Sequence, residues 1–567
     1  MKEQQEKYYL PEGWIWTTID EIGIVVSGGT PSTKNKEFWV GDISWITPAD
    51  LSDYKEKFIA KGSRNISLLG LDYSSAKLIP KGSVLFSSRA PIGYAVIAQN
   101  DLTTSQGFKN LIPMKQVDSE YIYYYFLTLK SLAEKVASGT TFLELSAKNF
   151  SKLPFPLCPL NEQKLIVSQI DLLFSKLDEA AKGLRTANSS LEIYKQALLK
   201  NAFEGLLTKN WRKDLSIDAY QELTGIKRKR KDRYDAEIEN KKGKKIKIDF
   251  EFDYKRDNKI SSWAMSSLDN LININARIGW RGLTKKEYTN EGALFLSVYS
   301  LNYGKNVVFK DANFISIGRY EESPEIQLKE NDILLCKDGA GIGKVGIIKK
   351  LPDIATVNSS LLVIDAREVF NPDFLYYFFL GPDMQRLVNA KISGSAIPHL
   401  FQKDIKKFKL KVPPKLEQDK IVEILESRFT LVDNLEKAID NVLNEVIALK
   451  HSILKKAFEG RLVNYSSDES VENLLNDIQK EKRLYLENQK EQNRSKPKQK
   501  KQMEEKKSIL EILKESNSPI SALELWEKST TDGDIERFYG EIKEIYHQID
   551  EIKSNTESLL ILKDEDK

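Results

Sequence analysis

The chain has 567 residues, of which 41% are hydrophobic and 30% are charged, and its formal net charge is only +4. A chain of this length exceeds what one hydrophobic core serves, so we expect several domains. The near balance of charge excludes a globally basic protein, so any binding of an acidic partner must rest on local clusters of lysine and arginine.

The N-terminal segment and the cysteines favour the cytoplasm. The first seven residues are polar, and no stretch of the chain approaches the roughly 20 apolar residues that span a bilayer. The two cysteines, Cys158 and Cys336, form neither a disulfide framework nor a metal-ligand pattern, which fits a reducing compartment. We expect a cytoplasmic protein with no membrane partner.

Residues 1–158 predict a first globular domain, the first head. Short β-rich runs alternate with loops rich in glycine and serine, and a helix with aromatic residues follows at residues 121–129. This pattern indicates an α+β domain. Arg, Gln, Ser and Thr side chains read base edges in a DNA groove. Each loop alone reads as a turn, but the set favours DNA contact, and its candidates are Ser27, Thr30, Ser32, Ser88, Arg89, Ser105, Gln106 and Thr140.

A long helix, the first rod, is predicted over residues 159–206, and a second rod is predicted over residues 414–463. Residues 161–205 recur without gaps as residues 416–460. The offset of 255 residues, which relates Glu162 to Glu417, is the same at both ends. Each rod starts after proline and ends at glycine, the expected asymmetry of helix termini. About 44 residues at ~1.5 Å each give a helix near 65 Å long.

Apolar residues step by three and four along both rods in the same phase. This spacing predicts that the rods pack on each other as a coiled coil, and antiparallel packing is expected because each rod leads away from its own head. Two independent surface helices are the alternative. The predicted seam comprises Leu177, Ala180, Leu184, Ala187, Leu191, Tyr194 and Leu198 with Val432, Leu435, Ile439, Val442, Val446, Leu449 and Ile453.

Residues 207–260 form a basic linker, and residues 261–413 repeat the first head weakly as a second head. The basic runs 227–231 and 241–245 indicate either a mobile tether or an auxiliary DNA contact. The polar loops of the second head supply further candidates for DNA contact: Arg277, Trp280, Arg281, Lys285, Lys337, Asn358 and Ser359. Matched rods between unlike heads suggest two different targets held at one distance.

Catalytic motifs are not supported. Residues 338–346 lack the spacing and the Ser or Thr of a phosphate-binding loop, and residues 371–374 read as a helix N-cap rather than a methyltransferase tetrad. His399, His451 and His547 have no metal-ligand spacing. We expect no catalytic residue, no metal site and no directly bound cofactor.

The tail divides into a charged helical and basic linker, residues 464–507, and a small domain, residues 508–567. Three short amphipathic helices and an apolar strand at residues 559–562 resemble a winged helix. Such a module binds DNA or another protein, and the acidic residues here favour protein docking.

Residues 10–14, 27–32 and 88–93 and both rods, with their Glu-Gln starts and Ala-Phe-Glu-Gly ends, resemble the specificity subunit of type I restriction-modification enzymes over residues 10–463. The resemblance implies two target recognition domains that each read half of a bipartite, asymmetric site on double-stranded DNA. It also implies rods that set the spacer between the halves, so a heptad inserted into a rod is expected to change that spacing.

The resemblance further implies partners. Two methyltransferase subunits using S-adenosylmethionine and two motor-nuclease subunits using ATP and Mg²⁺ would join this chain, which itself has none of these activities. The residues implied for subunit docking and the spacer helices are Glu162, Gln163, Phe203, Glu204, Glu417, Gln418, Phe458 and Glu459. A single-chain restriction-methyltransferase component and a coiled-coil scaffold are the alternatives. The first requires a methyltransferase tetrad and a nuclease carboxylate cluster, and the second leaves the unlike heads unexplained.

Overall fold

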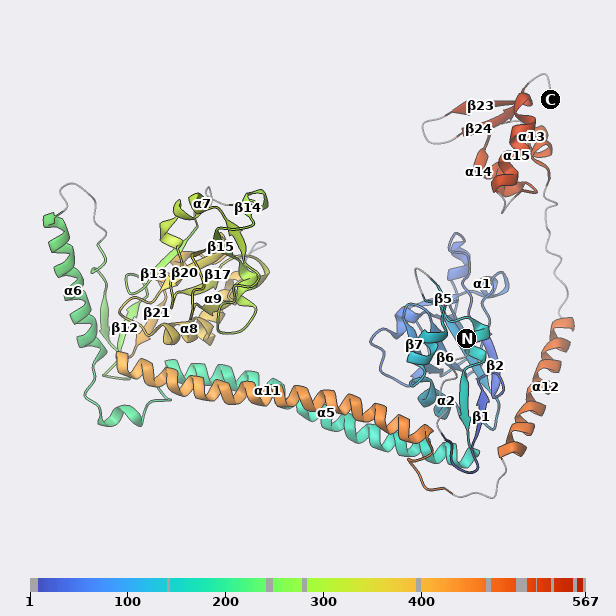
Figure 1. Ribbon diagram of the computed structural model, residues 1–567, viewed down its shortest axis with the longest axis horizontal. Coiled ribbons are helices and arrows are strands. Elements are labelled where there is room, and N and C mark those ends of the chain that lie inside the picture. The colour runs from blue at the N-terminus through green and yellow to red at the C-terminus, as the bar shows by residue number, and fades with distance from the viewer. Residues whose placement is uncertain are drawn as a thin grey trace.

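The computed structural model describes residues 9–139, 143–240, 248–277, 283–393, 399–465, 471–495, 507–516, 518–531, 535–553 and 558–563. Figure 1 shows two globular heads at opposite ends of a pair of long helices, and a small third domain beyond the first head. The predicted class, two α+β domains joined by long antiparallel helices, is confirmed.

The rods are the helices α5 (Leu160–Phe203) and α11 (Lys415–Phe458), each 44 residues long. Each rod is followed by a glycine in the left-handed region, with φ of 73° at Gly205 and 66° at Gly460. The last turn of α5 lies in the core of the second head, and the last turn of α11 lies in the core of the first. The predicted antiparallel packing is therefore confirmed, and each rod is anchored at both ends.

The seam between the rods differs from the predicted one at about half of its positions. Ala181 and Val432 are buried, and the neighbouring contact positions on both rods are half-buried. Polar residues share this contact, since the Lys195 Nζ lies 2.8 Å from a Glu436 carboxylate oxygen. One facing helix covers only a narrow stripe, which leaves other predicted seam residues exposed: Ala180, Ala187, Tyr194, Leu435, Val442 and Leu449.

The first head is built on a five-stranded sheet of order β2-β9-β6-β7-β4, with a second sheet of order β5-β3-β8 and a pair β1-β10. Aromatic and aliphatic side chains of the helix α2 (Ser119–Phe126) fill the core between the main sheet and the rods. The strands are Ile15–Thr18 (β1), Gly23–Ser27 (β2), Ile43–Ile46 (β3), Phe58–Ile59 (β4), Arg64–Ile66 (β5), Val84–Ser88 (β6), Ile92–Ala98 (β7), Thr103–Thr104 (β8), Phe108–Pro113 (β9) and Pro154–Leu157 (β10). The short helices are Leu68–Asp72 (α1), Lys130–Val136 (α3) and Ala147–Ser151 (α4).

The second head repeats this topology. Its sheets have the orders β13-β20-β17-β18, β14-β16-β15-β19 and β11-β12-β21, so β13, β20, β17 and β18 correspond to β2, β9, β6 and β7. The parallel pair β3-β8 also recurs as β15-β19. The strands are Tyr254–Arg256 (β11), Ala264–Ser267 (β12), Asn273–Ala276 (β13), Tyr288–Thr289 (β14), Ala293–Leu296 (β15), Asn313–Ile315 (β16), Ile333–Cys336 (β17), Val345–Ile347 (β18), Ala355–Val357 (β19), Leu361–Asp365 (β20) and Lys409–Val412 (β21). The helices are Ile317–Glu321 (α7), Pro372–Leu380 (α8), Pro382–Ser393 (α9) and Gln402–Lys406 (α10).

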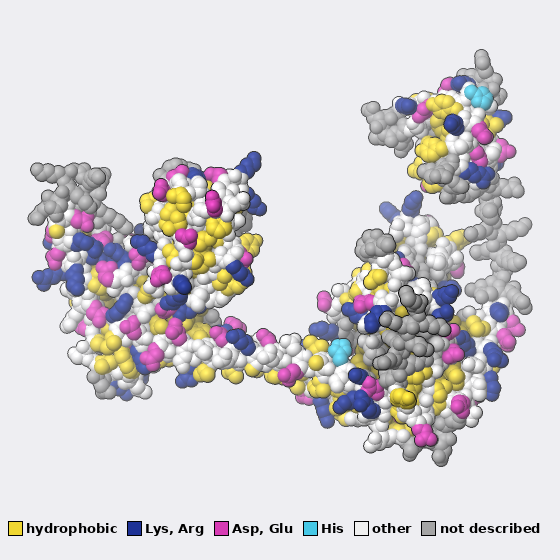
Figure 2. All heavy atoms as spheres, in the orientation of Figure 1, with side chains coloured by type: hydrophobic (Ala, Val, Ile, Leu, Met, Phe, Trp, Pro, Cys, Tyr) yellow, Lys and Arg dark blue, Asp and Glu magenta, His cyan; other side chains and the backbone are white. Residues whose placement is uncertain are grey.

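The basic linker is ordered against the second head over its described residues. The helix α6 (Ala219–Asn240) carries the first basic run, and Figure 2 shows Lys and Arg side chains on its surface. Arg230 is 1% exposed, and its Nε donates to Glu368 Oε1 at 2.6 Å. The prediction of a mobile tether is therefore wrong for this helix, because a buried, bonded guanidinium fixes it to the head. Residues 241–247, with the second basic run, lie outside the described residues.

The helix α12 (Val471–Ser495) packs on the first head through Val471, Leu474 and Ile478. The third domain contains the three predicted helices and the apolar strand, and the structure adds two short strands. Its elements are Ile509–Glu515 (α13), Ile520–Ser521 (β22), Ala522–Lys528 (α14), Ile535–Ile545 (α15), Ile549–Lys553 (β23) and Ser558–Leu562 (β24). In the described part of the chain, no helix has the length and apolar character needed to cross a membrane.

Candidate nucleic-acid interface

The Glu-Gln pair at the start of each rod joins the rod to its own head. The Trp14 Nε1 donates to Glu162 Oε2 at 3.0 Å, and the Trp263 Nε1 donates to Glu417 Oε2 at 2.8 Å. The two carboxylates are 6% and 0% exposed. Burial raises the pKa of Glu162, and the bond from Trp14 opposes that rise.

The glutamines at the next position hold the helix that lines each core. The backbone N–H of Asp118 donates to Gln163 Oε1, and that of Asn371 donates to Gln418 Oε1, both at 2.8 Å. Asp118 and Asn371 are the N-cap residues of α2 and α8. The repeated Glu-Gln pair therefore fixes one geometry between rod and head at both ends of the molecule.

The far end of each rod packs on the opposite head. The Phe458 ring lies 5.2 Å from the ring centroid of Tyr121 and 5.0 Å from that of Tyr125. The Phe203 ring lies 5.3 Å from that of Phe374 in the second head. Such aromatic contacts add to the burial of large apolar surface.

These contacts correct the prediction of subunit docking for most of its residues. Glu162, Gln163, Glu417, Gln418 and Phe458 are buried inside the chain, and Phe203 is half-buried against the second head. A partner subunit cannot reach side chains already enclosed by this chain's own heads. Glu204 is exposed, and Glu459 is half-buried and paired with Arg461, so for these two subunit docking stays a prediction.

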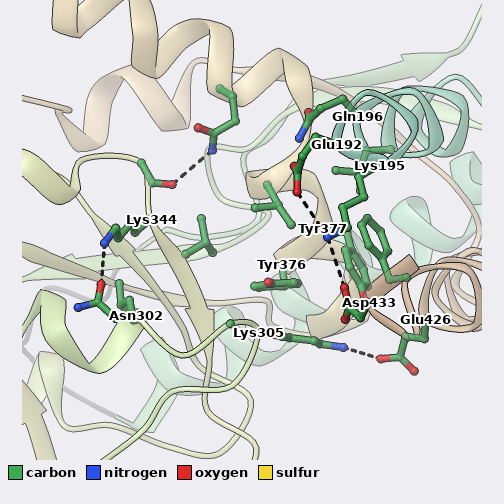
Figure 3. A pocket seen from close by; sticks show the side chains of 18 of the residues that line it. Glu192, Lys195, Gln196, Asn302, Lys305, Lys344, Tyr376, Tyr377, Glu426 and Asp433 are labelled. Atoms are coloured by element: carbon green, nitrogen blue, oxygen red, sulfur yellow. Dashed lines mark hydrogen bonds and ion pairs between the residues drawn. The ribbon is translucent and has the colours of Figure 1, made fainter. Parts of the chain in front are cut away.

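Charged residues line a groove of about 840 Å³ where the second head meets both rods. In Figure 3, Lys195 of α5 reaches toward Glu192 and Asp433, and Lys305 of the head is bonded to Glu426 of α11. Burial opposes the positive charge on Lys305, but its two carboxylate partners outweigh burial and raise its pKa. The groove is thus part of the joint that orients the second head on the rods.

Three predicted DNA-contact residues of the first head lie together. The Thr30 hydroxyl donates to Gln106 Oε1, which joins the loop after β2 to the turn after β8. The Gly29 N–H donates to the Thr104 carbonyl oxygen at 2.8 Å, and a Cβ on Gly28 would lie 1.9 Å from the Ser105 carbonyl oxygen. Glycine is therefore required where these two loops touch.

The turn after β6 joins the same cluster. The Ser88 N–H donates to the Gly107 carbonyl oxygen at 2.7 Å, and the Leu145 N–H donates to the Ser88 carbonyl oxygen at 2.9 Å. Arg89 is partly exposed there, 3.6 Å from Glu144. Ser27, the last residue of β2, and Ser32, on the loop that follows, are exposed, whereas Thr140 lies outside the described residues.

The second head brings the equivalent loops together with the same backbone bonds. The Lys337 N–H donates to Ser360 at 2.9 Å, and the Leu400 N–H donates to Lys337 at 3.0 Å. Asn358 donates its N–H to Leu296 at 2.9 Å, as Ser105 does to Ile46 at 2.8 Å in the first head. Of the predicted residues, Lys337 and Asn358 are half-buried in this cluster and Ser359 is exposed.

Three predicted DNA-contact residues are buried, and the prediction is corrected for them. Arg277 is 3% exposed, and its Nε donates to the Val357 carbonyl oxygen at 3.1 Å, so it supports the strands. Ser88 and Ser105 are 0% and 7% exposed, so their backbones shape the loops while their side chains face inward. Lys285 is exposed on a separate 3₁₀ helix, and Trp280 and Arg281 lie outside the described residues.

Sequence reasoning missed two charged groups in these clusters. In the first head, Lys109 is 6% exposed and lies 3.6 Å from Glu144. Burial lowers the pKa of Lys109, and the charge of Glu144 opposes that shift. In the second head, Asp338 pairs with Lys337 and with the Nδ1 of His399. The internal repeat could have identified these positions, because Glu144 and His399 each precede a leucine whose backbone N–H bonds the equivalent turn.

The described residues contain no group of three or more His, Cys, Asp or Glu side chains placed to hold a metal ion. Both cysteines are free and buried. Burial raises the pKa of the Cys158 thiol and that of Cys336, so neither is poised as a nucleophile. What the clusters offer is an array of hydrogen-bonding and charged groups on loops.

Comparisons with known proteins agree with this arrangement. The family model of the type I restriction modification DNA specificity domain matches residues 11–185 and 260–445. The specificity subunit of the type I restriction enzyme MjaIX from Methanocaldococcus jannaschii is 30% identical over 459 residues, 80% of this chain and 94% of that protein. The EcoKI specificity subunit of Escherichia coli is 24% identical over 479 residues, 80% of this chain and 90% of that protein.

The fold is also found among solved structures. A chain from a study of complex assembly in the type I restriction-modification system aligns with a TM-score of 0.56 and 18% identity. The alignment covers 80% of this chain and 100% of that chain. The likeness concerns the fold, namely two heads on paired helices.

Proposed function

Because the chain belongs to the type I restriction-modification DNA specificity family, we propose that its two heads read the two halves of one asymmetric site on double-stranded DNA. It is a specificity subunit rather than a catalytic one. The observation that carries the proposal is the matched loop cluster on each head: the same backbone bonds hold different side chains at equivalent places.

The DNA contacts would come from the exposed and half-buried side chains of these loops. Gln106 and Asn358 carry amides suited to adenine, and Arg89 and Lys337 carry cations suited to guanine or phosphate. The full set proposed is Ser27, Thr30, Ser32, Arg89, Gln106, Lys285, Lys337, Asn358 and Ser359.

The rods would set the spacer between the half-sites. Half-sites one helical turn apart lie about 34 Å from centre to centre, and rods of 44 residues are near 65 Å long at ~1.5 Å per residue. Heads at the two ends of such rods can bracket that separation. Since both rods are anchored at both ends, the distance between the heads is fixed by two helices rather than one.

Methyltransferase subunits would dock on the apolar face that the rods leave exposed. Leu435, Val442 and Leu449 recur every seven residues on α11 and are 53%, 41% and 48% exposed. Figure 2 shows hydrophobic side chains along the rods. Large apolar side chains that recur exposed along one helix are typical of a protein interface. Two methyltransferase and two motor-nuclease subunits are the proposed partners, and these would hold S-adenosylmethionine, ATP and Mg²⁺.

Docking is tested by substituting this stripe. Leu435→Ala/Leu449→Ala is expected to weaken co-purification with a co-expressed methyltransferase subunit of the same system by at least tenfold, given about 1 kcal/mol or more for each buried leucine lost. Lys437→Ala, an exposed control on the same helix, should leave co-purification unchanged. Equal recovery of methyltransferase with the double variant would show that the stripe is not the docking surface.

DNA reading is tested by mapping methylated adenines after the chain is expressed with its methyltransferase. A two-part motif with unspecified bases between its halves supports the function. Gln106→Ala should relax the half read by the first head and leave the other half intact. A motif without a gap, or methyl transfer by this chain alone, would refute the function.

A further inference from the structure

Glu144 stands out in the first head because it is an acidic side chain among loops proposed to face DNA. We propose that Glu144 is a specificity-determining residue that accepts a hydrogen bond from the N4 amino group of a cytosine in the first half-site. This inference rests on the proposed function and names one chemical feature of the DNA that the first head selects.

The backbone holds Glu144 between the reading loops. Its N–H and carbonyl group form a pair of bonds with Ser138, at 2.9 and 3.0 Å, and the next residue, Leu145, bonds the turn at Ser88. The Glu144 side chain is 44% exposed. It therefore stands beside Arg89 and next to the turn that carries Gln106, with its oxygens open to an incoming group.

Two nearby cations offset the repulsion between the Glu144 carboxylate and the phosphates of DNA. Glu144 Oε2 lies 3.6 Å from Arg89 Nη1, and Glu144 Oε1 lies 3.6 Å from Lys109 Nζ. Lys109 is almost fully buried, and its Nζ also lies 3.4 Å from the Gln106 carbonyl oxygen. Both ion pairs are longer than a hydrogen bond of 2.7–3.2 Å. The cations thus offset the charge of Glu144 and leave its lone pairs free for a donor.

The chemistry of the carboxylate selects the base. An ionised carboxylate only accepts hydrogen bonds, and in the major groove only cytosine N4 and adenine N6 present donors. Adenine N7 is an acceptor beside N6, so it would repel the second carboxylate oxygen, whereas cytosine has no such acceptor. Guanine and thymine present acceptors at this edge. Cytosine is therefore the base that fits Glu144 best.

The second head has a different group at the matched position. Leu400 bonds Lys337 as Leu145 bonds Ser88, and the residue before it is His399, whose Nδ1 faces Asp338. An imidazole held by a carboxylate does not have the acceptor-only chemistry of Glu144. One scaffold position thus carries two different readers, as expected if the two heads recognise unlike half-sites.

The test is methylation mapping by the assembled methyltransferase complex with Glu144→Gln. Glutamine pairs with adenine through N6 and N7, so one cytosine position of the first half-site should come to accept adenine. The preference for cytosine there should fall roughly tenfold, the value of one good base contact. The second half-site should stay unchanged. An unaltered motif in a folded variant would overturn the inference.

Two further variants keep the result interpretable. Glu134→Gln, an exposed change on α3 of the same head, should leave the motif unaltered. Because Glu144→Gln leaves Lys109 buried without its carboxylate, Lys109→Met/Glu144→Gln removes both charges and should show the same relaxed position. A change in the second half-site instead would also overturn the inference. A wild-type complex without any two-part motif would refute the proposed function itself, and so the two failures are distinct.

Discussion

The two heads share their backbone contacts but not the side chains that those contacts present. Equivalent turns are joined by equivalent N–H to carbonyl bonds, at Ser88 and Leu145 in one head and at Lys337 and Leu400 in the other. The side chains beside these bonds are Glu144 in the first and His399 in the second. A frame held by backbone bonds allows its side chains to vary, which is what two readers of unlike half-sites require.

The joints between heads and rods show the opposite pattern. The same Trp, Glu and Gln side chains recur at both ends with nearly the same distances. One difference remains, since Glu417 also bonds Thr208 and Arg212 from the linker. The joints fix where the heads stand, and the loops differ in the side chains that they present.

The largest effect is expected at the glycine that ends the second rod. A Cβ on Gly460 would lie 2.1 Å from the Pro11 ring, and its φ of 66° already disfavours a side chain. Gly460→Ala should therefore cost about 3 kcal/mol of stability at the joint with the first head, from left-handed strain plus a clash with a rigid ring. This loss of stability is measured by hydrogen exchange of the first head and by chemical unfolding.

Two matched glycines sharpen this test. At Gly205 the nearest atom is the flexible end of Ile260, 2.4 Å from the added Cβ, so Gly205→Ala should cost less. Gly183 lies inside α5 with nothing within 4 Å, so Gly183→Ala should be neutral or stabilising by about 0.5–1 kcal/mol. Equal effects at all three positions would contradict the two joints described.

A second difference between the heads is a buried carboxyl group. Burial raises the pKa of Asp332 to about 6 from 3.8, whereas the matching residue of the first head is the non-titrating Ser83. Between pH 3.8 and about 6, the Asp332 carboxyl group stays protonated in the folded second head but is ionised in the unfolded chain. Its stability should therefore fall by about 3 kcal/mol as pH rises from 3.8 to about 6, and stay level above that.

Asp332→Asn tests the group directly. The amide keeps an acceptor for the Lys329 N–H, which donates to Asp332 at 2.8 Å, but it does not titrate. Hydrogen exchange across this pH range should show the second head losing its pH dependence, while the first head is unaffected. If the stability of the second head still depended on pH in the variant, the titration would belong to another group.

A smaller effect is expected from the tryptophans of the two joints. Trp14→Phe removes the hydrogen bond described for Glu162, whereas Glu417 keeps Thr208 and Arg212 after Trp263→Phe. The first change should cost about 1.5 kcal/mol and the second less, because a buried carboxylate that loses a bond is costly. Thermal unfolding of both variants gives the comparison, and a larger loss at Trp263 would contradict it.

The sequence predicted the frame well and the side chains less well. The gapless repeat determined both rods, their length and their antiparallel course, because proline, glycine and apolar spacing are local signals. It misassigned Arg277 and Glu162, since a polar side chain buried by residues far away in the sequence looks like an exposed one. Glu144 and Lys109 were missed for the same reason: their proximity depends on how distant segments of the chain meet.

The most direct measurement is the methylation motif of a complex in which seven residues are inserted into both rods at matched positions. Insertion into both is necessary, because each rod is anchored to both heads. Seven residues add about 10 Å of helix, close to three base pairs at 3.4 Å each. The two half-sequences should persist with a spacer longer by about three base pairs. An unchanged spacer, or altered half-sequences, would contradict the central claim that the rods set the distance and the heads read the bases.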